Sequence, residues 1–155
     1  MPFYFWTEVS AGGQAQLEHL YKGLLIRLRD LTPAWHAILD DLDTVEAKWF
    51  DTEGGGSWRP LSPRYAAWKA KHYPGRPLLV REGFLRDALT NRGGRFRTEA
   101  IREHDARVSV HLPYAGEHQR GTATLPARPV IGINDQDRQR WVRLIRRFVM
   151  AEKGA

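Results

Sequence analysis

The stretch that decides the fold begins Trp58-Arg59-Pro60-Leu61-Ser62-Pro63, near the middle of the chain. Ser62 before Pro63 predicts the start of a short helix, because a serine hydroxyl accepts from free backbone N–H groups and proline fits the first helical turn. Trp58 is a large apolar side chain that we expect to anchor the preceding loop on the protein body. Its indole N–H then needs a hydrogen-bond partner.

The glycine run Gly54-Gly55-Gly56-Ser57 comes directly before this stretch. A phosphate-binding loop needs a buried strand in front of its glycines and a Gly-Lys-Ser or Gly-Lys-Thr ending. Both are missing, so we expect a hinge or a loop here instead.

Three further segments follow in order: Leu78-Leu79 with Gly83-Phe84-Leu85, Tyr114-Ala115 with His118-Gln119-Arg120-Gly121, and Pro126-Ala127-Arg128-Pro129. None of them is a catalytic motif. Gly83 and Gly121 predict positions of positive φ or of close backbone approach. Arg128, held between two prolines, is predicted to be a rigidly displayed cation that suits a carboxylate at an interface.

Two amphipathic helices are predicted before the glycine run. The first covers residues 14–30, where apolar residues recur at helical spacing: Leu17, Leu20, Tyr21, Leu24, Leu25 and Leu28. Thr32-Pro33 predicts an immediate restart, with Thr32 as N-cap. In the second helix Asp40, Asp41 and Asp43 are interpreted as a solvated face, because no further oxygen ligand follows at the spacing of a calcium loop.

Alternating or apolar segments predict four strands, at 3–9, 96–101, 107–112 and 129–133. A helix is expected around 81–91, and Asn134 is expected to cap the last helix, 135–152. The sequence therefore predicts one α+β domain over residues 1–155. Its small, mainly antiparallel sheet would be covered by the amphipathic helices at 14–30 and 135–152, and an all-helical structure is the alternative.

Composition narrows the class of protein. A chain of 155 residues fits one domain, and the absence of cysteine excludes disulfides and thiolate metal sites. No apolar run reaches the roughly 20 residues that span a bilayer, and the N-terminal residues lack the features of a signal peptide. We therefore expect a soluble protein made in the cytoplasm, without a membrane partner.

The formal net charge of +6 raises the possibility of a nucleic-acid partner. Arg140, Arg143 and Arg147 lie on one side of the last helix, and three interpretations stay open for them. They could contact an acidic patch of a protein, remain solvated, or bind phosphates. The basic residues as a whole are scattered, so they do not form one nucleic-acid-binding stripe.

Catalytic and metal chemistry finds little support. The six histidines are dispersed and form no i, i+4 pair, so no metal site is predicted. A hydrolase would have to combine His118 with Glu99 or Glu103 from distant positions. We therefore predict no catalytic, metal or cofactor-binding residue.

Taken together, the ordered segments resemble the phage virion morphogenesis family, the tail-completion proteins of long-tailed phages. The residues that carry the resemblance are Trp58, Pro60, Leu61, Leu79, Gly83, Leu85, Tyr114, Ala115, His118, Gly121, Pro126, Arg128 and Pro129. The resemblance implies a structural protein with no enzymatic step and no cofactor. The chain departs from the family pattern at Arg64-Tyr65 and at Glu82-Gly83, which leaves the subgroup open.

The resemblance further implies a place in the virion, at the head–tail neck, after assembly in the host cytoplasm. Partners would be other copies in a sixfold ring, neighbouring tail-terminator, tail-tube or head-closure proteins, and genomic DNA in passing. Contacts are predicted at Arg128, His118, the arginines of the last helix, and segments 53–57 and 91–97. A basic nucleic-acid-binding module is the alternative function.

Overall fold

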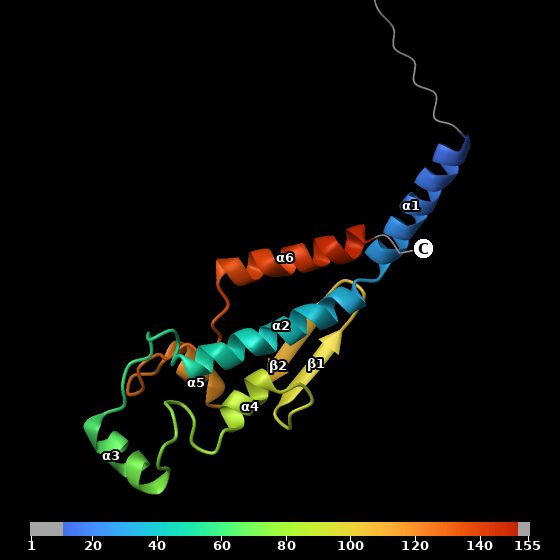
Figure 1. The fold of residues 1–155 in the computed structure, drawn as a ribbon. Helices are drawn as coiled ribbons and strands as arrows, with labels where there is room; N and C mark the ends of the chain where they lie inside the picture. The colour runs from blue at the N-terminus through green and yellow to red at the C-terminus, as the bar shows by residue number, and fades with distance from the viewer. Residues whose placement is uncertain (1–10, 152–155) are drawn as a thin grey trace, which may run out of the picture.

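The computed structural model describes residues 11–151. The predicted α+β class is confirmed: the described residues form helices and one antiparallel hairpin (Figure 1). The predicted strand at 3–9 lies outside the described residues. In chain order the elements are α1 (Ala11–Arg29), α2 (Thr32–Asp51), α3 (Pro63–His72), α4 (Phe84–Thr90), β1 (Arg97–Ile101), β2 (Ala106–Val110), α5 (Ala115–Arg120) and α6 (Asp135–Met150).

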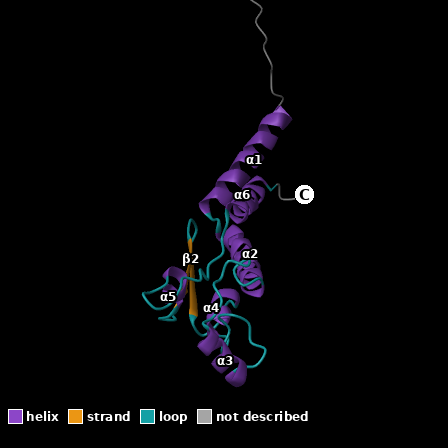
Figure 2. Ribbon diagram, turned by 90° about the vertical axis from the view of Figure 1, so that its left-hand side faces the viewer, coloured by secondary structure: helices purple, strands orange, loops and turns teal. Residues whose placement is uncertain are grey.

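Residues 30 and 31 separate the first two helices, which meet at a corner (Figure 1). Thr32 is not the N-cap, however: that position belongs to Leu31, and the backbone N–H of Thr32 donates to Asp30 Oδ1 at 2.9 Å. The N–H of Leu31 donates to the carbonyl of Glu103 at 2.9 Å, which ties the corner to the β-hairpin turn. From this corner α1 extends away from the rest of the protein (Figures 1 and 2).

Within residues 11–151 the sheet has two strands, in a register that pairs Arg97 with Val110 and Ile101 with Ala106. The predicted strand at 129–133 is wrong. The N–H groups of Val130 and Ile131 donate to the side-chain oxygen of Gln119, at 2.8 and 3.1 Å, and that of Gly132 donates to Glu46. Side chains therefore take the donors that a strand would need for its ladder.

The helices do not cover the sheet in the predicted way. The last helix, α6, packs on α1 and α2. The hairpin is held by α2 instead, since Asp43 of α2 bonds Arg97 of β1, so α2 stands between α6 and the hairpin (Figure 1). A two-stranded sheet offers little area on which helices can pack. The long helix α2 instead contacts α4 and α6 and so forms the centre of the fold.

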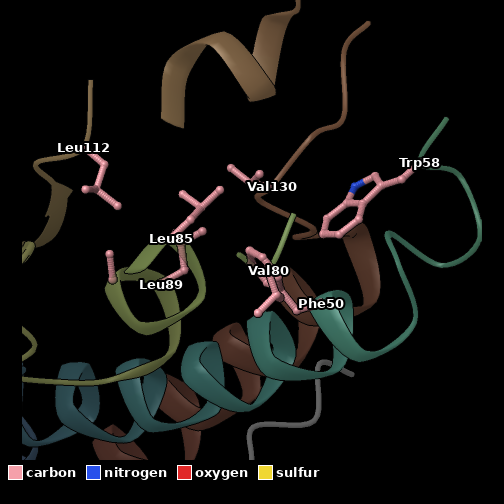
Figure 3. Packing of buried hydrophobic residues seen from close by; sticks show 8 residues of the cluster. Phe50, Trp58, Val80, Leu85, Leu89, Leu112 and Val130 are labelled. Atoms are coloured by element: carbon pink, nitrogen blue, oxygen red, sulfur yellow. The ribbon is translucent and has the colours of Figure 1, made fainter. Parts of the chain in front are cut away.

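The hydrophobic core lies where α2 and α4 meet the loops (Figure 3). Trp58 is 5 % exposed and meets Phe50 edge to face, with ring centroids 5.3 Å apart. Burying each such large side chain contributes about 1.5–3 kcal/mol. The cluster consists of Phe50, Trp58, Val80, Leu85, Ala88, Leu89, Leu112 and Val130.

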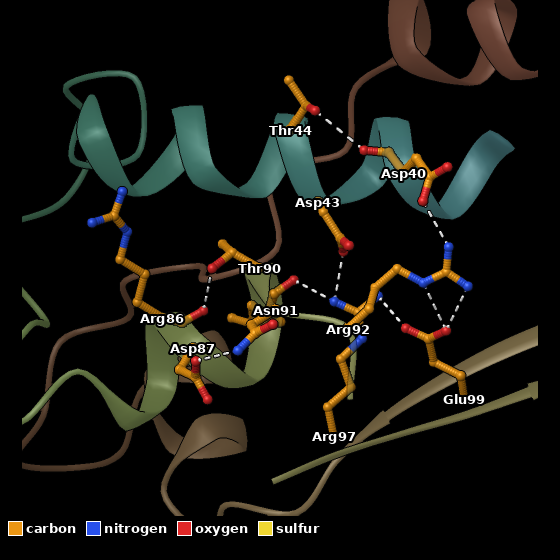
Figure 4. A network of polar contacts seen from close by, with 11 residues as sticks. Asp40, Asp43, Thr44, Arg86, Asp87, Thr90, Asn91, Arg92, Arg97 and Glu99 are labelled. Carbon is orange, nitrogen blue, oxygen red and sulfur yellow. Dashed lines mark hydrogen bonds and ion pairs between the residues drawn. The ribbon is translucent and has the colours of Figure 1, made fainter. Parts of the chain in front are cut away.

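Arginines join α2 to the hairpin (Figure 4). The fully buried side chain of Arg97 lies 2.6 Å from Asp43 and 2.8 Å from Glu99, and Arg92 bridges Asp40 and Glu99 at 2.7 and 3.0 Å. The solvated face predicted for the aspartates is therefore wrong for Asp43, whose side chain is 16 % exposed, and also for Asp41, which is 26 % exposed and bonds Arg140 of α6. Burial raises the pKa of Asp43, although the Arg97 guanidinium opposes that rise.

Two predicted helix starts are confirmed. Ser62 caps α3, where its hydroxyl accepts from the N–H of Tyr65. Asn134 caps α6 in a reciprocal capping box with Asp137, with both hydrogen bonds at 3.0 Å. Each cap fixes where its helix begins, because it satisfies N–H groups that have no partner inside the helix.

Candidate protein-interaction sites

The separate sequence segments converge on one pocket of about 600 Å³. Its walls come from the turn before α3, α3 itself, the loop that leads into α4, α5, and residues 124–128. Many of the residues that carry the family resemblance line this pocket. The residues that carry the resemblance and also line the pocket are Pro60, Leu61, Leu79, Gly83, Leu85, Tyr114, His118, Pro126 and Arg128.

Arg128 forms part of the pocket wall and is 3 % exposed, so the prediction that it is displayed on the surface is wrong. Its guanidinium donates to the carbonyls of Arg59 and Pro60, at 2.6 and 2.9 Å. Its backbone N–H donates to the carbonyl of His118 at 2.8 Å. Arg128 therefore joins three of the sequence segments, and burial lowers its pKa.

Gly121 and Gln119 shape the neighbouring turn. Gly121 has φ +77°, and a Cβ atom there would lie 2.8 Å from the backbone N of Ala127, so the predicted need for glycine is confirmed. Gly83, at φ +96°, also has the predicted positive φ and precedes α4. The role of Gln119 was missed, because a side-chain acceptor for residues 130 and 131 leaves no local pattern in the sequence.

Lys69 is a second buried cation in the pocket wall, and it too was missed. It is 6 % exposed, its ammonium donates to the carbonyl of Pro77, and burial lowers its pKa, although Glu53 opposes that shift. A signal was available, since α3 contains several basic residues and no Asp or Glu that could pair with them.

His118 lies on α5 beside Arg128. Among the described residues its buried Nδ1 atom has no hydrogen-bond partner. Burial lowers the pKa of His118, Arg128 lowers it further, and Glu117 opposes both. The imidazole is therefore held neutral, and His118 adds a polar edge rather than a charge to the pocket wall.

The pocket rim carries exposed aromatic rings. Tyr65, Phe84 and Tyr114 are 41 %, 47 % and 38 % exposed. Tyr65 continues into Trp68, with stacked rings 5.5 Å apart. Exposed aromatic residues of this kind are enriched at protein–protein interfaces. The charged part of the rim is the ion pair between Arg81 and Glu82, at 2.8 Å.

The arginines of α6 divide into two groups. Arg140 binds Asp41 through Nε and Nη2, at 2.9 and 2.8 Å, and also lies 2.8 Å from Asp137. Those hydrogen bonds raise its pKa further above the ordinary arginine value, so this residue serves the fold. Arg143 and Arg147 are exposed, and within residues 11–151 neither has a carboxylate within 4.0 Å.

The apolar stripe predicted on α1 is present, but it faces solvent. Leu17 and Tyr21 are 57 % and 62 % exposed, and Leu28 is 45 % exposed. Leu28 also borders an apolar groove of about 630 Å³ against Val142, Ile145, Arg146, Val149 and Met150 of α6. An amphipathic helix normally buries its apolar stripe, so the α1–α6 pair presents an apolar surface that no other part of residues 11–151 covers.

The candidates for a hydrolase are not brought together. His118 is on α5, Glu99 pairs with Arg92 and Arg97 on the hairpin, and Glu103 lies at the hairpin turn beside Leu31. Over residues 11–151 no group of three His, Cys, Asp or Glu side chains is placed to hold a metal ion. The same part of the chain has no helix that could cross a membrane.

Residues 13–150 match the profile of the phage virion morphogenesis family. No curated protein and no solved structure is similar enough to the chain to add a further comparison. The family match covers nearly the whole chain and includes every segment that lines the pocket. This protein belongs to the phage virion morphogenesis family.

Proposed function

We propose that this protein completes the phage tail and joins it at the head–tail neck, where its copies form a closed ring. Family membership already makes it a structural, tail-related virion protein. The proposal adds three points to family membership: the position at the neck, the ring and the identity of the partners. Neighbouring tail-terminator, tail-tube or head-closure proteins would be the other partners.

The observation that carries the proposal is the apolar stripe on α1, which is exposed among residues 11–151, together with the groove against α6. Soluble monomers rarely expose a contiguous apolar surface of this kind without a binding partner. Arg143 and Arg147 lie one helical turn apart on α6, next in sequence to the groove residues Val142 and Arg146. They would supply polar contacts at the edge of the groove.

The arrangement of the surfaces supports head-to-tail contacts. The start of α1 and helix α3 lie at opposite ends of the described structure (Figures 1 and 2), and α3 forms part of the pocket wall. Two different surfaces that meet between successive copies generate a ring when the rotation closes. A symmetric dimer would instead use one patch twice.

Net charge limits how strongly copies associate on their own. Each chain carries +6, so the copies of a ring repel one another unless acidic partners are present. We therefore expect a protein that is monomeric or weakly associated in solution and forms a closed ring only in the assembled neck.

The test replaces Arg143 and Arg147 together with glutamate in an infectious phage. Joined heads and tails are then counted by electron microscopy. We expect free heads and free tails to accumulate while the purified variant keeps its melting temperature, because both side chains are exposed and unpaired within residues 11–151. Normal virions would show that this face of α6 is only solvated.

The control makes the same charge change elsewhere, with Arg102→Glu and Arg107→Glu on the exposed side of the hairpin. Those virions should assemble normally. If both double variants block assembly, net charge rather than the α6 surface is responsible.

A basic nucleic-acid-binding module is the second candidate, favoured by the exposed arginines of α6. It predicts tight binding of duplex DNA with a steep decrease in affinity as salt rises, since each neutralised phosphate releases counterions. Weak binding with a shallow salt slope would exclude that function and leave the structural one.

A further inference from the structure

The pocket wall holds two buried cations that have no ion-pair partner within 4.0 Å among the described residues, although the Glu53 carboxylate acts on Lys69 from farther away. Lys69 and Arg128 are 6 % and 3 % exposed, and within residues 11–151 neither forms an ion pair with an acidic side chain. Within the described part of the chain, Lys69 donates to the carbonyl of Pro77, and the Arg128 guanidinium donates to those of Arg59 and Pro60. Burying unpaired charge is costly, so this wall of the pocket favours an anion.

The rest of the pocket is suited to apolar groups. Leu61, Leu79, Leu85 and Leu125 contribute to its lining, and Tyr65, Phe84 and Tyr114 surround the opening. Leu79 has φ +58°, an uncommon conformation for a residue with a branched side chain. Backbone strain of this kind occurs often at binding sites.

We propose that the pocket binds a short segment of a neighbouring virion protein in which an Asp or Glu stands next to aromatic or aliphatic side chains. This inference rests on the proposed function and names the chemistry of a partner. The carboxylate would lie against Lys69 and Arg128, where it accepts charge-assisted hydrogen bonds. The apolar side chains would pack between the leucines and the aromatic rim.

A peptide fits these observations better than a nucleic acid does. Phosphate backbones are bound by cations that reach out into solvent, whereas Lys69 and Arg128 lie within an apolar wall. A peptide of this kind matches both features of the pocket. Its carboxylate complements the two buried cations, and its apolar side chains are buried against the leucines and aromatic rings. This combination also gives specificity, because a neutral peptide leaves both cations unpaired.

The first test uses two synthetic peptides, N-acetyl-Phe-Glu-Leu-amide and its glutamine counterpart, titrated into the full-length protein and followed by amide NMR shifts. We expect the Glu peptide to bind at least about tenfold more tightly, as a hydrogen bond to a charged group requires. The shifts should centre on the residues around Leu79 and Leu125. Equal affinity of the two peptides, or no binding of either, would overturn the proposal.

Inorganic phosphate and a single-stranded oligonucleotide serve as further probes. If either binds the pocket more tightly than the Glu peptide, the site recognises anions or nucleic acid in general and the proposal is wrong. Binding of both that is weaker than that of the peptide supports recognition of a carboxylate among apolar groups.

Variants then locate the contact. Lys69→Met should reduce the ratio of the affinities for the Glu and Gln peptides several-fold. Arg143→Met, which also removes one positive charge but lies outside the pocket, should leave that ratio unchanged. Tyr65→Ala should weaken both peptides by a similar factor, because the rim contacts their apolar part. If Lys69→Met does not fold, the comparison of the two peptides on the unchanged protein still decides the question.

Failure of this inference is distinct from failure of the proposed function. If the peptides do not bind but the α6 double variant blocks tail joining, the structural function stands and the pocket has no acidic partner. If the Glu peptide binds but the α6 variant assembles normally, the pocket stands and the α6 interface is wrong.

Discussion

Trp49 and Trp58 donate their indole N–H groups to the same carbonyl oxygen, that of Pro129, at 2.9 and 2.7 Å. One tryptophan comes from the end of α2 and the other from the turn that follows the glycine run. Pro129 ends the Pro-Ala-Arg-Pro turn. This shared acceptor therefore fastens three separate segments of the chain beside the core, and it confirms that the Trp58 indole finds a partner.

Trp58→Phe should destabilise the protein by about 1–3 kcal/mol, because it removes a buried hydrogen bond and part of a buried ring. Urea unfolding followed by circular dichroism measures the change. Trp68→Phe is the matched control, since Trp68 is 40 % exposed and its loss of ring area should cost less than about 0.5 kcal/mol. Equal effects at the two positions would contradict this role for Trp58.

Gly121→Ala should cost more stability than Gly93→Ala. Both glycines have positive φ, +77° and +76°, but Gly121 also has ψ 171°, a combination that is essentially restricted to glycine. At Gly121 the new Cβ would also lie 2.8 Å from the backbone N of Ala127, whereas a Cβ at Gly93 would meet no atom of the other described residues within 4 Å, its two chain neighbours aside. The melting temperatures of the two variants measure the combined backbone and steric cost at Gly121, and equal losses at the two positions would contradict it.

Glu46 should make stability depend on pH. Glu46 is 1 % exposed as a residue, and burial raises its pKa to about 7. The native state then keeps a proton that the unfolded state loses above the ordinary value of about 4.5, so the contribution to stability is complete below pH 4.5 and decreases until about pH 7.

Glu46→Gln removes this titration and should leave the acceptor for the Gly132 N–H in place. The variant should match the wild type near pH 4 and exceed its stability at pH 8 by on the order of 3 kcal/mol. Unfolding free energies across this range test the prediction. Parallel curves for the two proteins would show that Glu46 titrates normally.

Tyr21→Ser should weaken self-association while leaving the fold intact, because Tyr21 is 62 % exposed on the apolar stripe of α1. Ile26→Ser is the control: Ile26 is 67 % exposed on the opposite side of the same helix. Sedimentation equilibrium at high protein concentration, or with added neck proteins, measures association. A larger effect of Ile26→Ser would mean that the stripe is not the interface.

Local signals in the sequence determined much of the fold. Ser62-Pro63 and Asn134 marked helix starts that the structure confirms, because a cap acts on N–H groups only two or three residues away. The helical spacing of apolar residues was sufficient to predict α1, and the alternation of residues was sufficient to predict β2. For the candidate site, the order of the short segments indicated the family, and the positive φ of Gly83 and Gly121 followed from their residue type.

Tertiary structure decided what depends on distant partners. Residues 129–133 look like a strand, yet the Gln119 side chain takes their N–H groups. Arg128 looks displayed, yet carbonyls nearly 70 positions earlier in the chain bind it. Arg140 bonds Asp41, which lies 99 positions earlier in the chain, whereas Arg143 on the same helix is exposed. Burial and pairing of a charge depend on which groups folding brings near it, and no local pattern records that.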